Sequence, residues 1–143
     1  MSTNPSINTK TYTIKELATK FNIQSSTLRY YEDLGLLENV GRTNTNQRIY
    51  TDEHISRLNA ISCFKNTGLP ISKMQDFFRY EKDLSNNIED IIQLVTEHEK
   101  NINEQIKRMQ NELAHIEHKV RYYNGIKQAI ETNKPWPCWE DCN

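Results

Sequence analysis

TLRYYEDLGLL, residues 27–37, is the stretch of sequence that decides the fold of this chain. Leu28, Tyr31 and Leu34 recur every third residue, which predicts one inward-facing side of a short helix. Gly35 follows them and can adopt the left-handed conformation in which helices commonly end. The stretch therefore predicts a short helix with an apolar side and a sharp C-terminal stop.

The other side of this helix carries side chains suited to reading DNA. Ser25 and Ser26 precede it and are expected to cap its N-terminus. Arg29 and Tyr30 are expected to project outward near its start, where a helix in the major groove needs hydrogen-bonding side chains. Tyr31 is expected in the core instead.

A first helix and a tight turn come before this segment. Apolar residues at helical spacing predict a helix over residues 14–22, and residues 23–24 form a turn to the helix of residues 25–34. Two short helices joined by a short turn are the sequence form of a helix-turn-helix.

A β-wing is predicted directly after the helix-turn-helix. Residues 36–40 and 48–50 have the pattern of two short strands around a polar, turn-forming tip. Arg42 and Arg48 are expected near the base of this wing, and Tyr50 closes it.

Two more short helices complete the head of the protein. Thr51 is the expected N-cap of a helix that ends near Gly68, and Pro70 starts the next helix. Residues 12–81 are thus expected to form one winged-helix domain. Residues 1–11 are rich in Ser, Thr and Asn and are expected to be disordered.

A seven-residue apolar repeat dominates the second half of the chain. About six heptads without a proline predict one long helix over residues 85–131, followed by a tail of residues 132–143. Because so long a helix cannot bury its apolar stripe against the head alone, a second copy of the chain is the simplest partner. The expected dimerisation residues are Ile88, Ile92, Val95, Ile102, Ile106, Met109, Leu113, Ile116, Val120 and Tyr123.

The two halves of the chain differ in charge. Residues 1–82 contain 11 lysines and arginines against 8 acidic residues, a net charge of +3. Residues 83–143 contain 7 against 11, a net charge of −4. This division is consistent with a first half that faces DNA and a second half that stays away from the phosphates.

The sequence indicates neither secretion nor a membrane span. No stretch approaches the roughly 20 apolar residues that a spanning helix needs, and the first ten residues are polar. Cys63, Cys138 and Cys142 make an odd number of thiols, which argues against a disulfide framework. A soluble, cytoplasmic protein with reduced thiols is expected, without a membrane partner.

The sequence does not predict an enzyme. It has no recognisable pair of nucleophile and base, no glycine-rich phosphate loop and no paired carboxylates, so no catalytic residue and no cofactor are expected. A coiled-coil adaptor without operator specificity would explain the heptads, but it would not explain Arg29, Tyr30 and the wing.

The motifs, in this order, resemble those of the MerR family of bacterial transcription regulators. The segments that carry the resemblance are Tyr12–Ala18, Thr27–Glu32, Gly35–Leu37, Arg48–Tyr50 and Thr67–Ile71. The resemblance implies a mainly α fold, with a winged helix-turn-helix head followed by a long antiparallel coiled-coil dimerisation helix.

The resemblance also implies how such a protein works. A homodimer binds a palindromic operator in a promoter spacer, and the effector-bound dimer distorts the DNA so that RNA polymerase can engage the promoter. Polymerase is thus a partner only indirectly, through promoter DNA. The positions that match DNA contacts of the family are Ser25, Thr27, Arg29, Tyr30, Arg42, Arg48 and Tyr50.

Two hypotheses about the effector remain open, and the first concerns Cys63. A cysteine just before this Lys-x-Thr-Gly segment resembles the branch of the family that responds through one thiol to carbonyl electrophiles or nitrosative stress. Lys65 or Arg57 is expected to lower the pKa of the thiol, as such reactivity requires. The alternative is a buried structural cysteine.

The second hypothesis concerns Cys138 and Cys142. Metal-responsive members of the family use a cysteine pair beyond the long helix, and thiolates suit copper(I) or zinc. Here the pair is more closely spaced than in that family loop. The alternative is a tail packed by Trp136 and Trp139, and no other metal ligand is expected.

Overall fold

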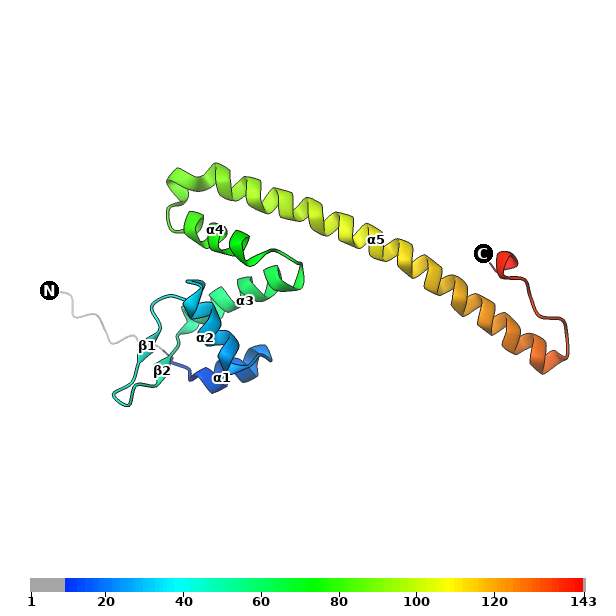
Figure 1. Cartoon of the computed structure of the whole chain (residues 1–143), viewed down its shortest axis with the longest axis horizontal. Helices are drawn as coiled ribbons and strands as arrows, with labels where there is room; N and C mark the ends of the chain where they lie inside the picture. The colour runs from blue at the N-terminus through cyan, green and yellow to red at the C-terminus, as the bar shows by residue number, and fades with distance from the viewer. Residues whose placement is uncertain (1–9, 143) are drawn as a thin grey trace. The chain divides into compact units, whose positions relative to one another are not determined.

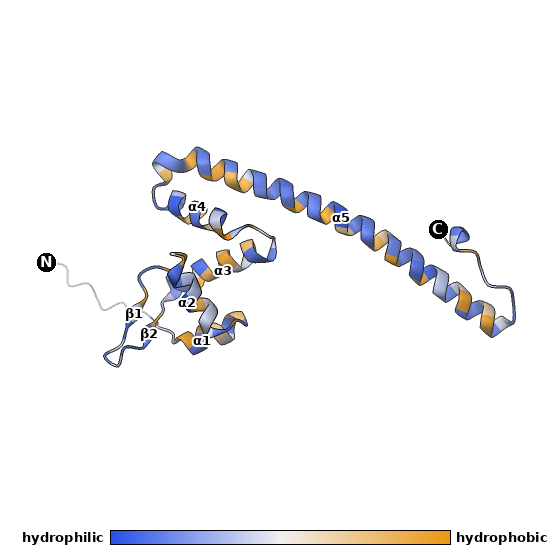
Figure 2. Ribbon diagram, viewed as in Figure 1, coloured by the Kyte–Doolittle hydropathy of each residue, from blue (hydrophilic) through white to orange (hydrophobic). Residues whose placement is uncertain are grey.

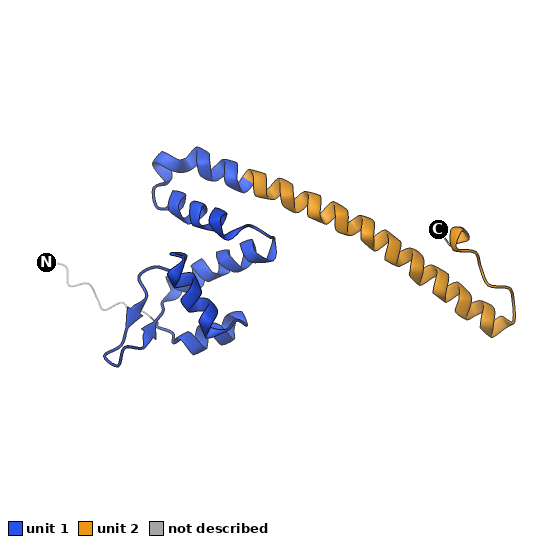
Figure 3. Cartoon of the chain, viewed as in Figure 1, with its two compact units in different colours: residues 1–95 blue, residues 96–143 orange. Residues whose placement is uncertain are grey.

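The computed structural model describes residues 10–142, most of which are helical. The predicted disorder of residues 1–11 concerns a segment that, up to residue 9, lies outside the described residues. The chain divides into two compact units, Met1–Val95 and Thr96–Asn143 (Figure 3). Within residues 10–142, no helix is both long and apolar enough to cross a membrane.

The elements follow the order expected for a winged helix-turn-helix and a long helix (Figure 1). They are α1 (Ile14–Phe21), α2 (Ser25–Asp33), β1 (Gly41–Arg42), β2 (Arg48–Ile49), α3 (Asp52–Asn66), α4 (Ile71–Glu81), α5 (Leu84–Thr132) and the 3₁₀ turn η1 (Trp139–Asp141).

Helix α1 begins with a reciprocal cap. The Glu16 amide donates to Thr13 Oγ1 over 3.1 Å, and the Thr13 amide donates to Glu16 Oε1 over 3.3 Å. The helix ends where Asn22 takes the left-handed conformation, with φ at 52°. Leu17 and Ala18 are buried, which confirms the predicted inward side of this helix.

Helix α2 begins differently from the sequence prediction. Gln24 occupies the N-cap position without a side-chain cap, and Ser25 is already the first helical residue. Ser26 Oγ donates to the side chain of Gln24 over 3.3 Å. The predicted serine cap is therefore wrong, because α2 already begins at Ser25 and the N-cap position falls to Gln24.

The end of α2 and its inward side are as predicted. Gly35 has φ of 76°, and its amide donates to the Glu32 carbonyl over 3.0 Å. Tyr31 is 6% exposed and belongs to the core of the head, as expected. The buried members of that core are Leu17, Ala18, Leu28, Tyr31, Leu36, Leu37, Tyr50, Leu58, Ile61, Leu69, Met74, Phe78 and Leu94.

The wing has shorter strands than predicted, and the first one is displaced. β1 and β2 pair antiparallel over two residues each, with Gly41 opposite Ile49. Residues 36–40, predicted as the first strand, instead run through the core, where Leu36 and Leu37 are buried. Asn39 then turns the chain with φ of 59° before β1 begins. Burial of these two neighbours is incompatible with the alternation of a surface strand.

A histidine fixes the wing to the start of α3. The Thr51 amide donates to Nδ1 of His54 over 2.9 Å, and the helix begins at the predicted Thr51 cap. Nε2 of His54 donates to the Glu38 carbonyl over 2.7 Å. Because the ring is buried and uses both nitrogens, it ties the loop before β1 to α3.

Helix α5 spans nearly the predicted range of residues 85–131. The sequence did not predict a break at Asn87, where φ is −122° and ψ is 15°. Figure 2 shows hydrophobic residues recurring along α5 between hydrophilic ones. Leu94, near the end of the first unit, joins the head core.

The tail of the second unit folds back onto α5. The Trp139 ring stacks on His118 with ring centroids 4.0 Å apart, and Nε of Arg121 donates to the Cys142 carbonyl over 2.7 Å. A Cβ at Gly125 would lie 3.0 Å from Cγ of Pro137, so glycine allows this close approach. The sequence alternative of a tail packed by Trp136 and Trp139 thus holds for Trp139, whereas Trp136 is 61% exposed.

Candidate nucleic-acid interface

Helix α2 presents its polar side to solvent because its apolar side is locked in the core. Leu28 is fully buried, whereas Arg29 and Tyr30 are exposed, Tyr30 to 50%. Ser25 and Thr27 are half-buried at the start of the helix. These four polar residues therefore lie on or beside one accessible surface, as a groove-reading helix requires.

An ion pair joins α2 to the base of the wing. Nε of Arg48 lies 2.6 Å from Oε2 of Glu32, and both side chains are largely buried, at 23% and 16% exposure. Sequence reasoning did not assign a role to Glu32, because no local pattern connects residues 16 positions apart. This pair fixes the wing relative to α2 and restricts the direction in which Arg48 can point.

Arg42 extends from the exposed part of the wing. Its Nη1 donates to the Asn46 carbonyl over 3.2 Å, across the tip. The tip is also closed by Thr43, whose Oγ1 accepts from the Gln47 amide over 3.0 Å. Arg42 is exposed and held by one neutral acceptor, so its charge remains available to an anion.

Tyr50 lies in the core, which corrects its prediction as a DNA contact. Its side chain is fully buried, and its hydroxyl has no hydrogen-bond partner among the described residues. A hydroxyl without access to solvent cannot reach a phosphate unless the wing moves. Tyr50 instead packs in the core at the base of the wing, where the centroid of its ring lies 5.5 Å from that of His54.

The surroundings of Tyr50 show that charges from α2 and the wing converge there. Burial, and then Glu32, raise the pKa of the Tyr50 phenol to about 12. The positive charges of Arg48, Arg42 and Arg29 act in the opposite direction. Three arginines that are separate in sequence thus influence one point, at the junction of the helix and the wing.

A hollow beside the wing adds a cation that the sequence analysis left out. It has a volume of about 480 Å³ and is lined by Thr13, Ile14, Lys15, Asn46, Gln47 and Arg48. Lys15 lies in the first turn of α1 and is exposed. Its position on the side of α1 opposite Leu17 could have indicated a surface role.

The thiol of Cys63 is exposed on α3 and is not the buried cysteine of the alternative reading. The neighbouring cations are placed less favourably than expected. Arg57 lies over the Phe78 ring at 4.0 Å and donates to the Leu36 carbonyl over 3.5 Å. Lys65, two positions from Cys63 on the same helix, projects from a different side.

The cysteine pair of the tail lies around η1. Sγ of Cys142 donates to the Cys138 carbonyl over 3.5 Å. Across residues 10–142, no three metal-binding side chains gather at one point. The pair thus has no third protein ligand among residues 10–142.

Comparison with known protein families identifies the head. The family model described as MerR HTH family regulatory protein matches residues 12–81. A protein of Haemophilus influenzae, described as an uncharacterized HTH-type transcriptional regulator, is 33% identical over 117 residues, covering 82% of this chain and 87% of that protein. YyaN of Bacillus subtilis, also described as an uncharacterized HTH-type transcriptional regulator, is 29% identical over 133 residues, covering 84% and 96%.

A solved structure extends this likeness over almost the whole chain. The crystal structure of HiNmlR, described as a MerR family regulator lacking the sensor domain and bound to promoter DNA, superposes with a TM-score of 0.77. It is 30% identical, and the match covers 94% of this chain and 96% of that one. The likeness therefore includes α5 as well as the head.

Proposed function

The chain belongs to the MerR family of helix-turn-helix regulatory proteins, and from this premise we propose that it binds a palindromic promoter operator as a homodimer. One observation carries the proposal: Arg29 and Tyr30 are exposed on a helix whose other side is buried, beside a cationic wing. The relatives are described as regulators and not as enzymes, in agreement with the prediction of a non-enzymatic protein.

The proposed contacts fall into two classes. Arg29 and Tyr30 read base edges in the major groove, with Ser25 and Thr27 beside them at the start of α2. Arg42 contacts phosphates from the wing, and Arg48 does so within the limits set by Glu32. Lys15 adds a phosphate contact that the sequence analysis did not include. The HiNmlR structure, described as bound to promoter DNA, supports DNA as the partner of this surface.

The expected dimerisation residues between Ile88 and Tyr123 form an apolar seam along α5, and this seam supports the proposed dimer. In the single chain, Met109 is 70% exposed, Leu113 53% and Val120 55%. A stripe of large apolar side chains this exposed is unfavourable in water and needs a partner surface. A second α5 offers such a surface, because it carries the same heptad pattern. We therefore assign residues 12–81 to DNA binding and residues 85–131 to dimerisation.

The mode of activation follows from the proposed dimer. Two heads held at a fixed spacing on one palindrome can bend and untwist the spacer between the promoter elements. RNA polymerase then responds to the altered DNA and needs no direct contact with the protein. The cytoplasmic location expected from the sequence remains a prediction.

The proposed effector is an electrophile or oxidant sensed through Cys63. Its support is the exposure of this thiol on α3, within the head. A Cys63→Ser variant should lose induction by formaldehyde or methylglyoxal in a transcription reporter. Full induction in that variant would contradict sensing through Cys63. The alternative is a metal bound by Cys138 and Cys142, which requires stoichiometric uptake of zinc or copper by the purified protein.

The experiment that tests the proposed function is a titration of operator DNA with an Arg29→Ala variant. The operator would first be selected from a pool of random duplexes with the wild-type protein. Affinity should fall by about 100-fold or more, because both heads lose a base contact. Arg108→Ala, an exposed arginine on α5, is the matched control and should bind normally. Unchanged affinity of Arg29→Ala would overturn the proposal.

A further inference from the structure

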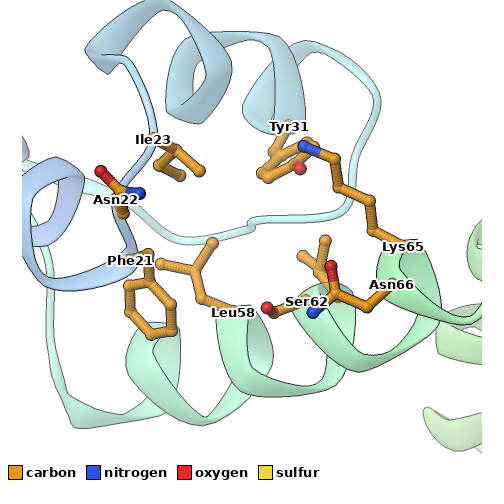
Figure 4. Close-up of a pocket in the computed structure, with 9 residues that line it drawn as sticks. Phe21, Asn22, Ile23, Tyr31, Leu58, Ser62, Lys65 and Asn66 are labelled. Atoms are coloured by element: carbon orange, nitrogen blue, oxygen red, sulfur yellow. The ribbon is translucent and has the colours of Figure 1, made fainter. Parts of the chain in front are cut away.

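A pocket in the head lies between the helix-turn-helix and α3 (Figure 4). Its volume is about 210 Å³. It is lined by Phe21, Asn22, Ile23, Tyr31, Leu58, Ile61, Ser62, Lys65 and Asn66. All of these residues lie in the first compact unit, and none is among the proposed DNA contacts.

The pocket combines apolar walls with hydrogen-bond donors. Phe21, Ile23 and Leu58 supply apolar surface, whereas Ser62 and Asn66 supply polar groups along α3. Lys65 is the single charged residue among the nine that line it, and none of them is a carboxylate. The pocket is therefore electropositive and suits an anion with an apolar body.

Two of its polar groups lack protein partners. Tyr31 is 6% exposed, and among residues 10–142 neither a hydrogen bond to its hydroxyl nor an ion pair of Lys65 is present. Figure 4 shows Lys65 reaching from α3 toward Tyr31 of α2. Burial raises the pKa of the Tyr31 phenol, with a smaller effect from Tyr30, so this hydroxyl stays protonated and can donate. The Tyr31 hydroxyl and the Lys65 ammonium thus offer an anion two donors on the same side of the pocket.

The size of the pocket limits the ligand. Drug-sized ligands occupy pockets of about 300 Å³ or more, and a dry cavity of about 150 Å³ is enough for benzene. A volume of about 210 Å³ thus fits one ring with a small head group. We infer that this pocket binds a small aromatic monocarboxylate, with its ring against Phe21, Ile23 and Leu58 and its carboxylate between Tyr31 and Lys65.

Such a ligand would bridge two elements that position the recognition surface. Tyr31 is the neighbour of Tyr30 on α2, and Lys65 is on α3. A bound carboxylate would therefore tie α2 to α3 and change the freedom of the outward side of α2. This consequence for DNA binding rests on the proposed function, whereas ligand binding itself does not.

The test is a titration of the full-length protein with benzoate, followed by the NMR signals of labelled isoleucine and leucine methyl groups. Signals of Ile23, Ile61 and Leu58 should shift and saturate, while that of Ile106 on α5 stays unchanged. Benzyl alcohol, which has the ring without the charge, should bind about tenfold more weakly or worse.

Variants of the pocket test which side chains bind the carboxylate of benzoate. Lys65→Met should weaken benzoate binding by about tenfold or more, and Tyr31→Phe by a smaller factor. Lys73→Met, an exposed lysine on α4, is the matched control and should bind as the wild type does. Absence of shifts in the wild type, or equal affinity in Lys65→Met, would overturn the inference. Operator binding measured on the same samples keeps this result separate from that of the proposed function.

Discussion

The outward side of α2 and the seam of α5 both expose side chains proposed to bind partners, yet they are held in place differently. Arg29 is positioned by its own chain, because Leu28 and Tyr31 anchor the helix in a buried core. Leu113 has no such support and is 53% exposed in the single chain. The core of the head is thus formed within one copy of the protein, whereas the apolar seam of α5 is left exposed in one copy and is paired only in the proposed dimer.

The largest expected effect comes from a charge in the seam. Leu113→Glu keeps a good helix-forming residue but would bury an unpaired carboxylate in the dimer, raising its dissociation constant by about 100-fold or more. Sedimentation velocity should then detect a monomer with an intact head. Asn111→Glu, an exposed position away from the seam, is the matched control. A Leu113→Glu protein that remains dimeric would contradict the claim that the seam of α5 pairs two chains.

The next effect concerns the link between α2 and the wing. Glu32→Gln removes the charge that holds Arg48 at 2.6 Å and should lower the free energy of unfolding by about 1.5–3 kcal/mol. Chemical denaturation measures this loss, and a double-mutant cycle with Arg48→Met isolates the pair. Glu53→Gln, an exposed acid in the first turn of α3, serves as the control. Additive losses in the cycle would contradict a direct coupling.

A smaller and local effect is expected in the tail. Trp139→Ala removes the ring that stacks on His118 at 4.0 Å, and should cost about 0.5–1.5 kcal/mol of local stability. Hydrogen exchange of residues 136–142 should become faster, whereas the head should keep its protection. Trp136→Ala, at a 61% exposed ring, should change little. Equal acceleration in both variants would mean that the stacking does not hold the tail.

The smallest effect is expected for Tyr50→Phe, a variant that distinguishes a core role of Tyr50 from a direct contact with DNA. Tyr50→Phe removes a buried hydroxyl that has no partner among the described residues, so stability should be unchanged or rise by about 1 kcal/mol. Operator affinity should stay the same. A clear loss of affinity would restore Tyr50 as a direct contact.

The same residue predicts a pH dependence. The pKa of Tyr50 is raised from 10.0 to about 12 in the folded protein, so its contribution to stability is complete below pH 10 and is lost as the pH rises toward 12. Tyr50→Phe should therefore lose less stability than the wild type over this window. Thermal unfolding at successive pH values provides the comparison. If the stabilities of the two proteins fell in parallel with rising pH, Tyr50 would not be the group responsible for the loss of stability at alkaline pH.

The sequence predicted best where a pattern is local. The stop at Gly35, the inward Tyr31 and the limits of α5 follow from helical periodicity and from the freedom of glycine at positive φ. The break at Asn87 was not predicted, because no proline or glycine marks it. Periodicity gives the length of a helix more reliably than its interruptions.

Features that depend on contacts between distant segments were missed. The pair of Glu32 and Arg48 joins residues 16 positions apart, and Tyr50 is buried in the head core, where it contacts His54 of α3 and pairs with Tyr12. The strand predicted over residues 36–40 failed for the same reason, since Leu36 and Leu37 are drawn into the head core. Tertiary burial overrides strand propensity at such positions.

The measurement that tests the division of roles most directly is the sedimentation of labelled operator DNA with three proteins: the wild type, Arg29→Ala and Leu113→Glu. The wild type should carry the DNA as a dimer. Arg29→Ala should sediment as a dimer and leave the DNA free, and Leu113→Glu should sediment as a monomer with greatly weakened binding to the palindrome. Tight binding by Arg29→Ala, or a dimer of Leu113→Glu, would contradict the account that one region reads DNA and the other pairs two chains.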